Sequence, residues 1–242
     1  MARTVLFLYN DPIATEAMLG NAFADAGYDV ATFEVVPADR ADAPALHVEF
    51  PDPTDYDVIV PLGARWPVYD EKLKSTWVGA QTKLVLDAAA AGIPTLGVCF
   101  GGQLLAQAFG ARVSRSDLPE IGWYDVESDQ PELIPPGPWF EWHFDRFTLP
   151  PGATEIARTA SAVQAFALGR AVGLQFHPEL DPGLLELWLD DDRDAGEAGL
   201  LGVSHDDLRT RTAELHDDAG RRIRALVNGF LTYTARQPCP SS

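Results

Sequence analysis

The sequence predicts an α/β fold in which a parallel sheet is followed by an antiparallel part. Apolar, strand-like segments alternate with helical segments up to about residue 110, which is typical of βαβ units. The strand segments are also almost continuously apolar, as expected for strands whose two faces are both covered by helices. These segments are 4–10, 29–37, 57–63 and 95–100.

The helical segments lie between these strands. Residues 13–28 follow the first strand, residues 71–91 form a longer stretch that ends in AAAAG, and a helix that begins GGQLLAQAF follows the fourth strand. One or two amphipathic helices are expected over 204–236, where residues four positions apart carry opposite charges.

After residue 111 the segments become short and alternating, and turn residues separate them. This pattern predicts antiparallel strands that extend or flank the parallel sheet. In VQAFAL-GR-AVGLQF (163–176), Gly169 and Arg170 form the expected turn of a hairpin. The other predicted strands are 111–116, 121–128 and 154–160.

The length of 242 residues fits a single domain, with a core over about 1–190 and a helical segment over 204–236. The formal net charge of −18 disfavours non-specific binding to nucleic acid or to an anionic membrane. No stretch approaches the roughly 18 apolar residues of a membrane span. We therefore expect a cytoplasmic protein.

Cys99 stands where the fourth strand meets the next helix, with Gly97 two residues before it and Gly101 two residues after it. A strand that runs directly into a helix strains the backbone of the corner residue, and glycines at these positions avoid a collision. The corner side chain then projects above the carboxyl end of the sheet, at a helix N-terminus whose dipole favours a thiolate. The pattern predicts a nucleophile, while a buried packing cysteine stays open on this motif alone.

The segment QFHPE (175–179) supplies the partners that a cysteine nucleophile needs. Residues two apart in an extended chain point to the same side, and Pro178 favours an extended conformation in the residue before it. A carboxylate beside an imidazole fixes the tautomer of the ring and stabilises the imidazolium. Cys99, His177 and Glu179 therefore fit the roles of nucleophile, base and orienting acid.

These motifs carry a family resemblance. TLGVCFGGQLLAQAFG (95–110) together with GLQFHPE (173–179) resembles the class I glutamine amidotransferases, and most closely their stand-alone, GMP-synthase-like members. The likeness extends to LGARWPVYDE (62–71), PEIGWYDVE (119–127) and WHFDRFTLPPGATEIA (142–157), so it covers roughly residues 55–180. It implies an open, mostly parallel, flavodoxin-like sheet flanked by helices, which agrees with the alternation described above.

The resemblance also implies a role for each matching residue. Cys99 would attack the γ-amide carbon of glutamine and form a thioester, while His177 would protonate the departing ammonia and later activate water. Glu179 would orient His177, and the backbone N–H groups of Phe100 and Gly63 would bind the oxyanion. Further substrate-binding candidates are Gln103, Ala64, Arg65 and His143, the last of them in a loop near the active site.

The chain departs from the family at the loop that follows residue 62. The family pattern resembles Gly-Gly-Pro-x-Ser-Val-Tyr-Asp, whereas this chain has GARWPVYD (63–70). Ala64 resists a positive φ that glycine tolerates, so a different loop conformation is expected. Arg65 and Trp66 are either solvent-facing rim residues, or they pair with a carboxylate of the substrate or partner and pack against its body.

Three readings of the activity stay open. The ammonia passes to a separate synthetase subunit, or the chain acts alone as a hydrolase of γ-glutamyl amines or peptides, or the fold is a catalytically silent interaction module. No segment resembles the GxxxxGK[ST] loop of a nucleotide-using synthetase. Dienelactone-type hydrolases and the PfpI superfamily also place a cysteine on such a turn, but a downstream His-Pro-Glu does not fit either.

No cofactor and no metal site are predicted. The acidic stretch LDDDRDAGEAG (189–199) lacks the ordered spacing of a calcium loop and is interpreted as a solvated insertion. Cys239, in the tail QPCPSS, is interpreted as a residue without a catalytic role. His47, His205 and His216 match no motif and are interpreted as surface residues.

Overall fold

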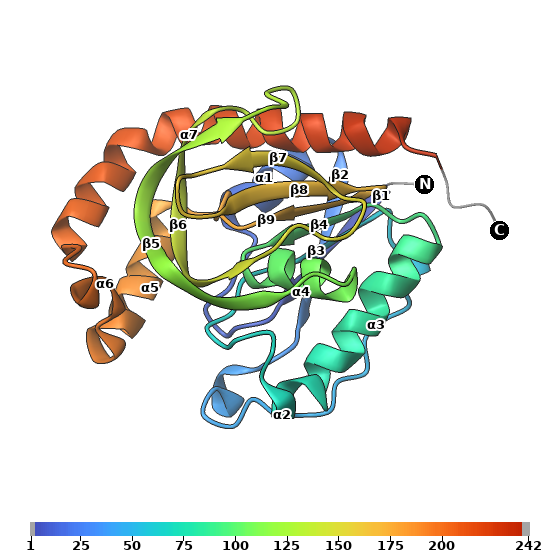
Figure 1. Cartoon of the computed structure of the whole chain (residues 1–242), viewed down its shortest axis with the longest axis horizontal. Coiled ribbons are helices and arrows are strands. Elements are labelled where there is room, and N and C mark those ends of the chain that lie inside the picture. Colours follow the sequence, from blue (N-terminus) through green and yellow to red (C-terminus); the bar gives the residue numbers. More distant parts are fainter. Residues whose placement is uncertain (1–2, 239–242) are drawn as a thin grey trace.

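Nine strands form one sheet, in the order β2-β1-β3-β4-β9-β8-β7-β5-β6 (Figure 1). The computed structural model describes residues 3–238, apart from the side chains of residues 193–195, so Cys239 lies outside the described residues. The strands are β1 (Arg3–Tyr9), β2 (Tyr28–Glu34), β3 (Val58–Pro61), β4 (Thr95–Val98), β5 (Val113–Ser128), β6 (Gly137–Phe147), β7 (Thr154–Arg158), β8 (Val163–Leu168) and β9 (Ala171–Leu174).

Helices cover the sheet and follow the strands as predicted. They are α1 (Ala17–Asp25), α2 (Glu71–Lys74), α3 (Trp77–Ala90), α4 (Phe100–Ala108), α5 (Pro182–Ala195), α6 (Glu197–Leu200) and α7 (His205–Arg236), with short 3₁₀ turns at Ala38–Arg40 and Pro53–Asp55. None of the helices between residues 3 and 238 combines the length and apolar character that crossing a bilayer requires.

The parallel part of the sheet has the order β2-β1-β3-β4-β9, which is the flavodoxin-like order expected from the sequence. The order in which strands are added to the sheet changes at β1: β2 pairs on one side of β1, and β3 then pairs on the other side. All five strands point their carboxyl ends to the same edge. Whatever follows these strands is therefore brought together there.

The antiparallel part continues the same sheet from β9. The hairpin predicted at Gly169 joins β8 to β9, and Gly169 has a φ of 57°, which suits a residue without a side chain. Strand β5 is long and curved in Figure 1; it pairs with β6 along most of its length and with β7 at Glu127 and Ser128.

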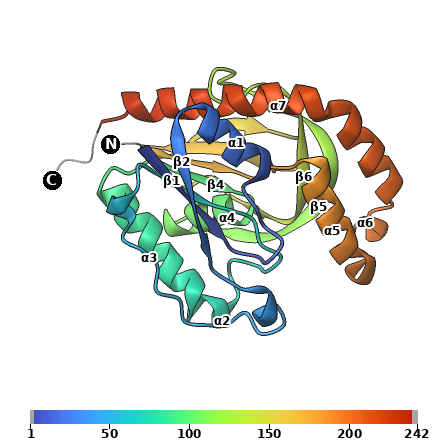
Figure 2. The same ribbon diagram turned by 180° about the vertical axis from the view of Figure 1, so that it is seen from behind.

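Helices lie on both faces of the sheet, and each face has its own apolar core. On one face, α1 and α7 pack side by side (Figure 2). Phe23 of α1 and Phe230 of α7 are buried there in one apolar cluster with residues of the sheet. On the other face, α3 and α4 bury Trp77 and Leu104 against the same strands. Covered on both faces, the central strands have to be apolar throughout, as their sequences are.

Three predictions differ from the structure. The helix predicted over 71–91 is divided into α2 and α3, because the backbone of Thr76 between them is not helical (φ −127°, ψ −124°). The break brings α3 so close to α2 that a Cβ at Gly79 would overlap the Lys74 carbonyl. The segment around His143, predicted as a loop, is strand β6, and the predicted strands 111–116 and 121–128 are one strand, β5. Each of these two strands is stabilised by pairing with the other, which local sequence does not reveal.

The close approach of α4 to β3 makes a first prediction. A Cβ at Gly101 would overlap the Pro61 carbonyl group, so Gly101→Ala should lower the free energy of unfolding by at least about 2 kcal/mol in urea denaturation. Gly199→Ala is the matched control, because nothing lies within 4 Å of a Cβ on Gly199 in α6. It should leave stability unchanged or raise it by up to about 1 kcal/mol. Equal effects of the two substitutions would contradict the proposed packing.

Candidate active site

A cavity of about 460 Å³ lies at the carboxyl edge of the parallel strands. The segments that follow β1, β3, β4 and β9 all reach it, and this is the place where open α/β sheets bind ligands. Of the residues predicted for the site, the cavity is lined by Gly63, Ala64, Arg65, Cys99, Gln103, His143, His177 and Glu179.

Cys99 is the corner residue between β4 and α4, with a φ of 50° and a ψ of −106°. This backbone conformation is unfavourable for a residue that carries a side chain, so the predicted strained turn is confirmed. A Cβ at Gly97 would overlap the backbone of Gly101. The glycines therefore allow α4 to start directly on the strands, and the cysteine side chain faces the cavity.

The Cys99 sulfur has polar neighbours on two sides. The thiol points to the Trp142 carbonyl oxygen at 3.9 Å, and Gln175 Nε2 donates to the sulfur at 3.7 Å. Gln103 Nε2 in turn donates to Gln175 Oε1 (3.4 Å) and to the Asp145 carbonyl (3.3 Å). The Gln175 side chain thus links Gln103 to the Cys99 sulfur. Gln103 was predicted to contact the substrate.

His177 and Glu179 lie side by side after β9, and the His177 Nδ1 atom is 2.7 Å from Glu179 Oε1. The predicted contact is present, but the extended conformation predicted for this segment was wrong. Residues 178 and 179 form a turn, closed by the Leu180 N–H and the His177 carbonyl at 3.5 Å. Pro178 occupies the second position of that turn, which proline favours because its φ is already set.

The electrostatics of the pair favour a charged imidazole. Burial by itself would lower the pKa of His177, but the Glu179 carboxylate and the contact with the Cys99 sulfur outweigh it and raise that pKa well above its usual value. The ring is also held from the side: Trp188 of α5 packs edge-on against it with a centroid distance of 4.7 Å. His177 is therefore fixed in position with both the acid and the sulfur within reach.

Gly63 lines the cavity next to Cys99 and His177. A Cβ on Gly63 would lie 3.1 Å from His177 Cε1 and 3.8 Å from Cys99 Cβ, so its backbone borders both. The loop that contains Gly63 is fixed at its start, because Asn10 Nδ2 donates a hydrogen bond to the Leu62 carbonyl at 2.9 Å. Phe100, the other predicted oxyanion residue, begins α4 directly after the nucleophile.

Ala64 and Arg65 continue this loop. Among the described residues, only Ala17 and Cys99 have a positive φ without being glycine, so Ala64 does not adopt the positive φ that glycine tolerates. The different loop conformation expected from this alanine stays a prediction. Arg65 is held by Asp11: Nε and Nη2 donate to the two carboxylate oxygens at 2.8 and 2.9 Å, and the backbone N–H adds a third bond at 3.1 Å. Arg65 Nη1 reaches Asp191 of α5 at 2.9 Å.

The described acidic residues of 189–199 are more than a solvated insertion. Asp191 pairs with Arg65 across the cavity, and Glu197 accepts a hydrogen bond from Trp142 Nε1 at 2.8 Å. Asp192 is only 3% exposed and accepts from the Glu197 N–H. The prediction was therefore wrong for Asp192 and Glu197, because α5 folds back over the cavity and gives these carboxylates hydrogen-bond partners, whereas Asp191 is exposed as predicted.

His143 lines the cavity from β6 and is 3% exposed. Its Nδ1 donates to the Asp145 carbonyl at 3.1 Å, and its Nε2 lies 3.1 Å from Glu120 Oε2 and 3.5 Å from Glu141 Oε2. Burial, and then the nearby charge of Glu120, raise the pKa of Glu141 well above its usual value. Two carboxyl groups and an imidazole thus meet behind the cavity wall.

The comparisons with known proteins agree with this arrangement. A family model described as glutamine amidotransferase class-I matches residues 17–188. The chain belongs to this family. The resemblance stated from the sequence is thereby confirmed, as is the α/β fold with a large sheet flanked by helices.

Curated relatives of this amidotransferase include glutamine-hydrolysing GMP synthases. The chain is 40% identical over 114 residues to that of Aeropyrum pernix, which covers 44% of this chain and 22% of the relative. It is 40% identical over 105 residues to that of Thermus thermophilus, which covers 38% of this chain and 20% of the relative. The chain therefore matches about a fifth of the length of these relatives.

Solved amidotransferase structures match over nearly the whole chain. A glutamine amidotransferase from Thermotoga maritima has a TM-score of 0.82 at 25% identity, and the match covers 96% of this chain and 99% of the other. A glutamine amidotransferase from Methylobacillus flagellatus has a TM-score of 0.75 at 23% identity and covers 95% of both chains. At that lower identity the second match supports the fold alone.

The amidotransferase site contains residues that the sequence analysis did not single out. Asn10 and Asp11 directly follow β1, and that position at the carboxyl edge is the signal that could have identified them. Gln175 was part of the QFHPE motif without an assigned role. The role of Trp188 could not be predicted from the neighbouring sequence, because its contact with His177 depends on how α5 folds back over the cavity.

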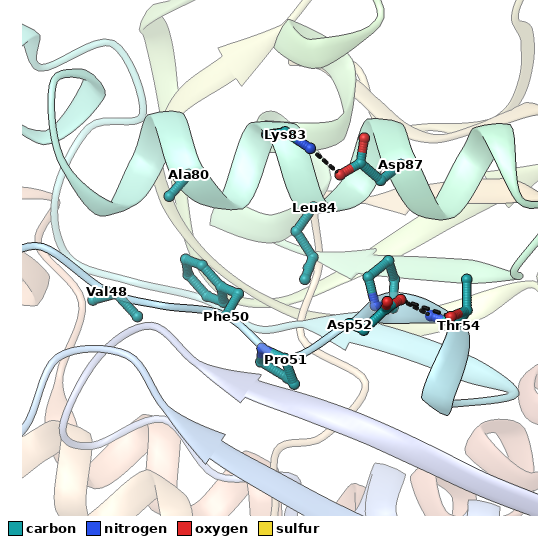
Figure 3. Close-up of a pocket in the computed structure, with 10 residues that line it drawn as sticks. Val48, Phe50, Pro51, Asp52, Thr54, Ala80, Lys83, Leu84 and Asp87 are labelled. Carbon is teal, nitrogen blue, oxygen red and sulfur yellow. Dashed lines mark hydrogen bonds and ion pairs between the residues drawn. The ribbon is translucent and has the colours of Figure 1, made fainter.

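A second hollow of about 500 Å³ lies elsewhere, between the segment before β3 and helix α3 (Figure 3). Its wall includes Phe50, Pro51 and Leu84, with an ion pair between Lys83 and Asp87 at the rim. No cysteine or histidine lines it. The candidate active site is therefore the cavity that Cys99, His177 and Glu179 line.

The environment of His177 makes a second prediction. Because the Glu179 carboxylate raises the pKa of His177, Glu179→Gln should lower that pKa, and burial should then dominate. A pH titration of the ring signals by NMR measures it. Glu197→Gln is the control: it removes a carboxylate from the same cavity that contacts Trp142 instead of His177, so it should leave the titration of His177 nearly unchanged. An unchanged His177 titration in Glu179→Gln would contradict the assigned pairing.

Proposed function

We propose that this amidotransferase hydrolyses the γ-amide of glutamine, or of a γ-glutamyl substrate, through a thioester on Cys99. One observation carries the proposal: a cysteine on a strained turn faces the same cavity as a His–Glu pair whose atoms are 2.7 Å apart. A nucleophile, a base and an orienting acid in contact are the requirements of this chemistry.

The proposed reaction has two halves. The Cys99 sulfur attacks the γ-carbonyl carbon, the carbon–nitrogen bond breaks, and His177 gives its proton to the departing nitrogen, which leaves as ammonia. Water then attacks the thioester carbon while His177 accepts a proton from it, and the carbon–sulfur bond breaks to release glutamate. Glu179 stabilises the imidazolium that exists between proton transfers.

Both tetrahedral intermediates carry a negative oxygen, and the proposed donors are backbone N–H groups. Phe100 is the first residue of α4, where the backbone N–H groups have no partner within the helix. A Cβ on Gly63 would lie 3.1 Å from His177 Cε1 and 3.8 Å from Cys99 Cβ, so the Gly63 backbone borders both of these side chains. We assign the oxyanion site to the N–H groups of these two residues, since fixed donors at the developing charge contribute strongly in acyl transfer.

The remaining cavity residues are assigned to substrate binding. The bonds of Gln103 Nε2 to Gln175 and to the Asp145 carbonyl fix the orientation of its amide beside the nucleophile. Ala64 and His143 line the cavity on either side. These positions surround the γ-glutamyl group in the proposal, and none of them takes part in a bond-breaking step.

We propose that a synthetase subunit receives the released ammonia. The support is that the similar proteins are named glutamine-hydrolysing GMP synthases. A second candidate is a hydrolase of γ-glutamyl amines that acts alone. The cavity volume of about 460 Å³ favours it, because there is room for a group beyond the γ-glutamyl part.

Turnover of glutamine and of γ-glutamyl amines by the purified chain separates these candidates. Efficient turnover of an amine conjugate alone favours the hydrolase, whereas slow glutamine turnover that a synthetase accelerates favours the subunit. A chain with no turnover under either condition, although it is folded, would support the silent interaction module. The expected cytoplasmic location stays a prediction.

The triad assignment makes a third prediction. Cys99→Ala and His177→Ala should each lower kcat for hydrolysis on the order of 10⁶-fold, and Glu179→Gln on the order of 10⁴-fold, because acid, base and nucleophile act as a unit. His216→Ala, a half-buried histidine on α7 outside the cavity, is the control and should retain activity. If Glu179→Gln were more damaging than His177→Ala, the roles would have to be reassigned.

Arg65 makes a fourth prediction. Its Asp191 partner is 41% exposed, and such exposed pairs contribute little stability, so a substrate or partner carboxylate can replace Asp191 while Asp11 keeps its bonds. Arg65→Ala should then raise KM by about 10- to 100-fold, the loss of one charged hydrogen-bonded pair, with a smaller change in kcat. Asp191→Asn should leave KM unchanged or lower it, because it frees Arg65. Equal KM values for the wild type and Arg65→Ala would contradict a role of Arg65 in substrate binding and would favour the interpretation as a solvent-facing rim residue.

A further inference from the structure

Three buried polar side chains meet where β5 and β6 pair behind the cavity wall. Glu120 lies opposite His143 in the strand register, and Glu141 is two residues before His143 on the same face of β6. Their exposed fractions are 2% for Glu120, 0% for Glu141 and 3% for His143. Groups of this kind are rarely buried unless they are paired or bind a metal.

Two of the three side chains have well-defined neighbours. Glu120 Oε2 accepts from Gln164 Nε2 at 2.9 Å and from the Thr159 hydroxyl at 3.2 Å. His143 Nδ1 donates to the Asp145 carbonyl at 3.1 Å, which directs Nε2 toward the carboxylates. The imidazole and one carboxylate are thus held in place from outside the cluster.

Glu141 is different, because neither of its carboxylate oxygens has a hydrogen-bond partner. Its Oε2 points toward His143 Nε2 at 3.5 Å, beyond a normal hydrogen bond. Among the described residues, no lysine or arginine forms an ion pair with Glu120 or Glu141. Two carboxyl groups buried side by side need either a proton or a cation to balance their charge, and the unpartnered oxygens of Glu141 leave room for a cation.

We propose that Glu120, Glu141 and His143 bind one divalent transition-metal cation of the Zn²⁺ type. One atom from each side chain lies within 4.8 Å of the others. A tetrahedral zinc site with bonds of about 2.0–2.1 Å places its ligand atoms about 3.3–3.4 Å apart, close to the 3.1 and 3.5 Å that separate His143 Nε2 from the two carboxylates. An imidazole together with carboxylates suits such a cation.

The surroundings match those of a metal site in a second respect. A histidine that binds a metal usually donates its other ring N–H to a carbonyl or carboxylate, and His143 does so to the Asp145 carbonyl. Gln164 and Thr159 orient Glu120 in the same manner. The spacing Glu120…Glu141-x-His143 carries no recognised metal motif, so the sequence analysis predicted no metal.

The cation would act on the wall of the catalytic cavity. Trp142, between Glu141 and His143, presents its carbonyl to the Cys99 thiol at 3.9 Å. A metal that joins β5 to β6 at this point fixes the strand that carries this carbonyl. The cation is therefore assigned a positioning role and takes no part in bond breaking.

Zinc binding by isothermal titration calorimetry tests the proposal. The chain should carry Cys99→Ala and Cys239→Ser, because thiolates bind zinc themselves. After dialysis against a chelator, this cysteine-free chain should bind one Zn²⁺ per chain, and its melting temperature should rise with added Zn²⁺. Glu141→Gln in this background should lower the affinity by at least about 100-fold, and Gln164→Ala by about 10- to 100-fold, the range for groups that orient a ligand.

Glu179→Gln is the matched control for zinc binding, because it removes a buried carboxylate that contacts a different histidine. It should leave the affinity unchanged. If circular dichroism shows that Glu141→Gln does not fold, Glu120→Gln replaces it, with the same expected loss. The absence of zinc binding by the cysteine-free chain would overturn the proposal, and a proton on Glu141 would then balance the charge. The proposal would also be overturned if Glu141→Gln left the zinc affinity unchanged, or if Glu179→Gln abolished zinc binding.

Discussion

The left-handed backbone of Cys99 is the constraint on which the rest of the site depends. A φ of 50° is tolerated there because α4 begins immediately after β4 and packs against the neighbouring strands without side chains in between. A Cβ at Gly101 would overlap the Pro61 carbonyl of β3, and one at Gly102 would overlap the Leu174 carbonyl of β9. The packing that stabilises the core thus holds the nucleophile in a conformation that it would not adopt alone. Strain at this residue is compensated by the helix behind it.

The sheet topology brings the partners of the nucleophile to the same edge. Because β9 is parallel to β4, the chain leaves it beside Cys99, and the turn after it places His177 and Glu179 over the cavity. The antiparallel strands therefore matter for the site. Strand β8 is antiparallel to β9, and β9 can thus run parallel to β4 and end beside Cys99. Helix α5 then folds back, and Trp188 packs against the His177 ring. Burial on this side strengthens the ion pair with Glu179, since water no longer screens it.

The contact between His177 and Glu179 and the strained turn at Cys99 could be predicted from the sequence because their signals are local. The glycines around Cys99 and the proline beside His177 each indicate the backbone conformation of only a few neighbouring residues. The other half of the site could not be predicted in this way. Arg65 contacts Asp11 and Asp191, which are 54 and 126 residues away, and these partners are defined only by the folded chain. The cluster of Glu120, Glu141 and His143 likewise depends on the register of β5 and β6, whose strand character comes from their pairing. For the same reason His143 was expected in a loop.

The proposed mechanism requires a covalent γ-glutamyl intermediate on Cys99 whose hydrolysis depends on His177 and Glu179. Mass spectrometry of acid-quenched turnover can detect this intermediate in the Glu179→Gln protein, in which its breakdown should be slow. We expect the intact chain to gain the mass of one γ-glutamyl group, and digestion to locate the added mass on the peptide that contains Cys99. Glutamine hydrolysis that proceeds without any adduct, or an adduct located on Cys239, would rule the mechanism out.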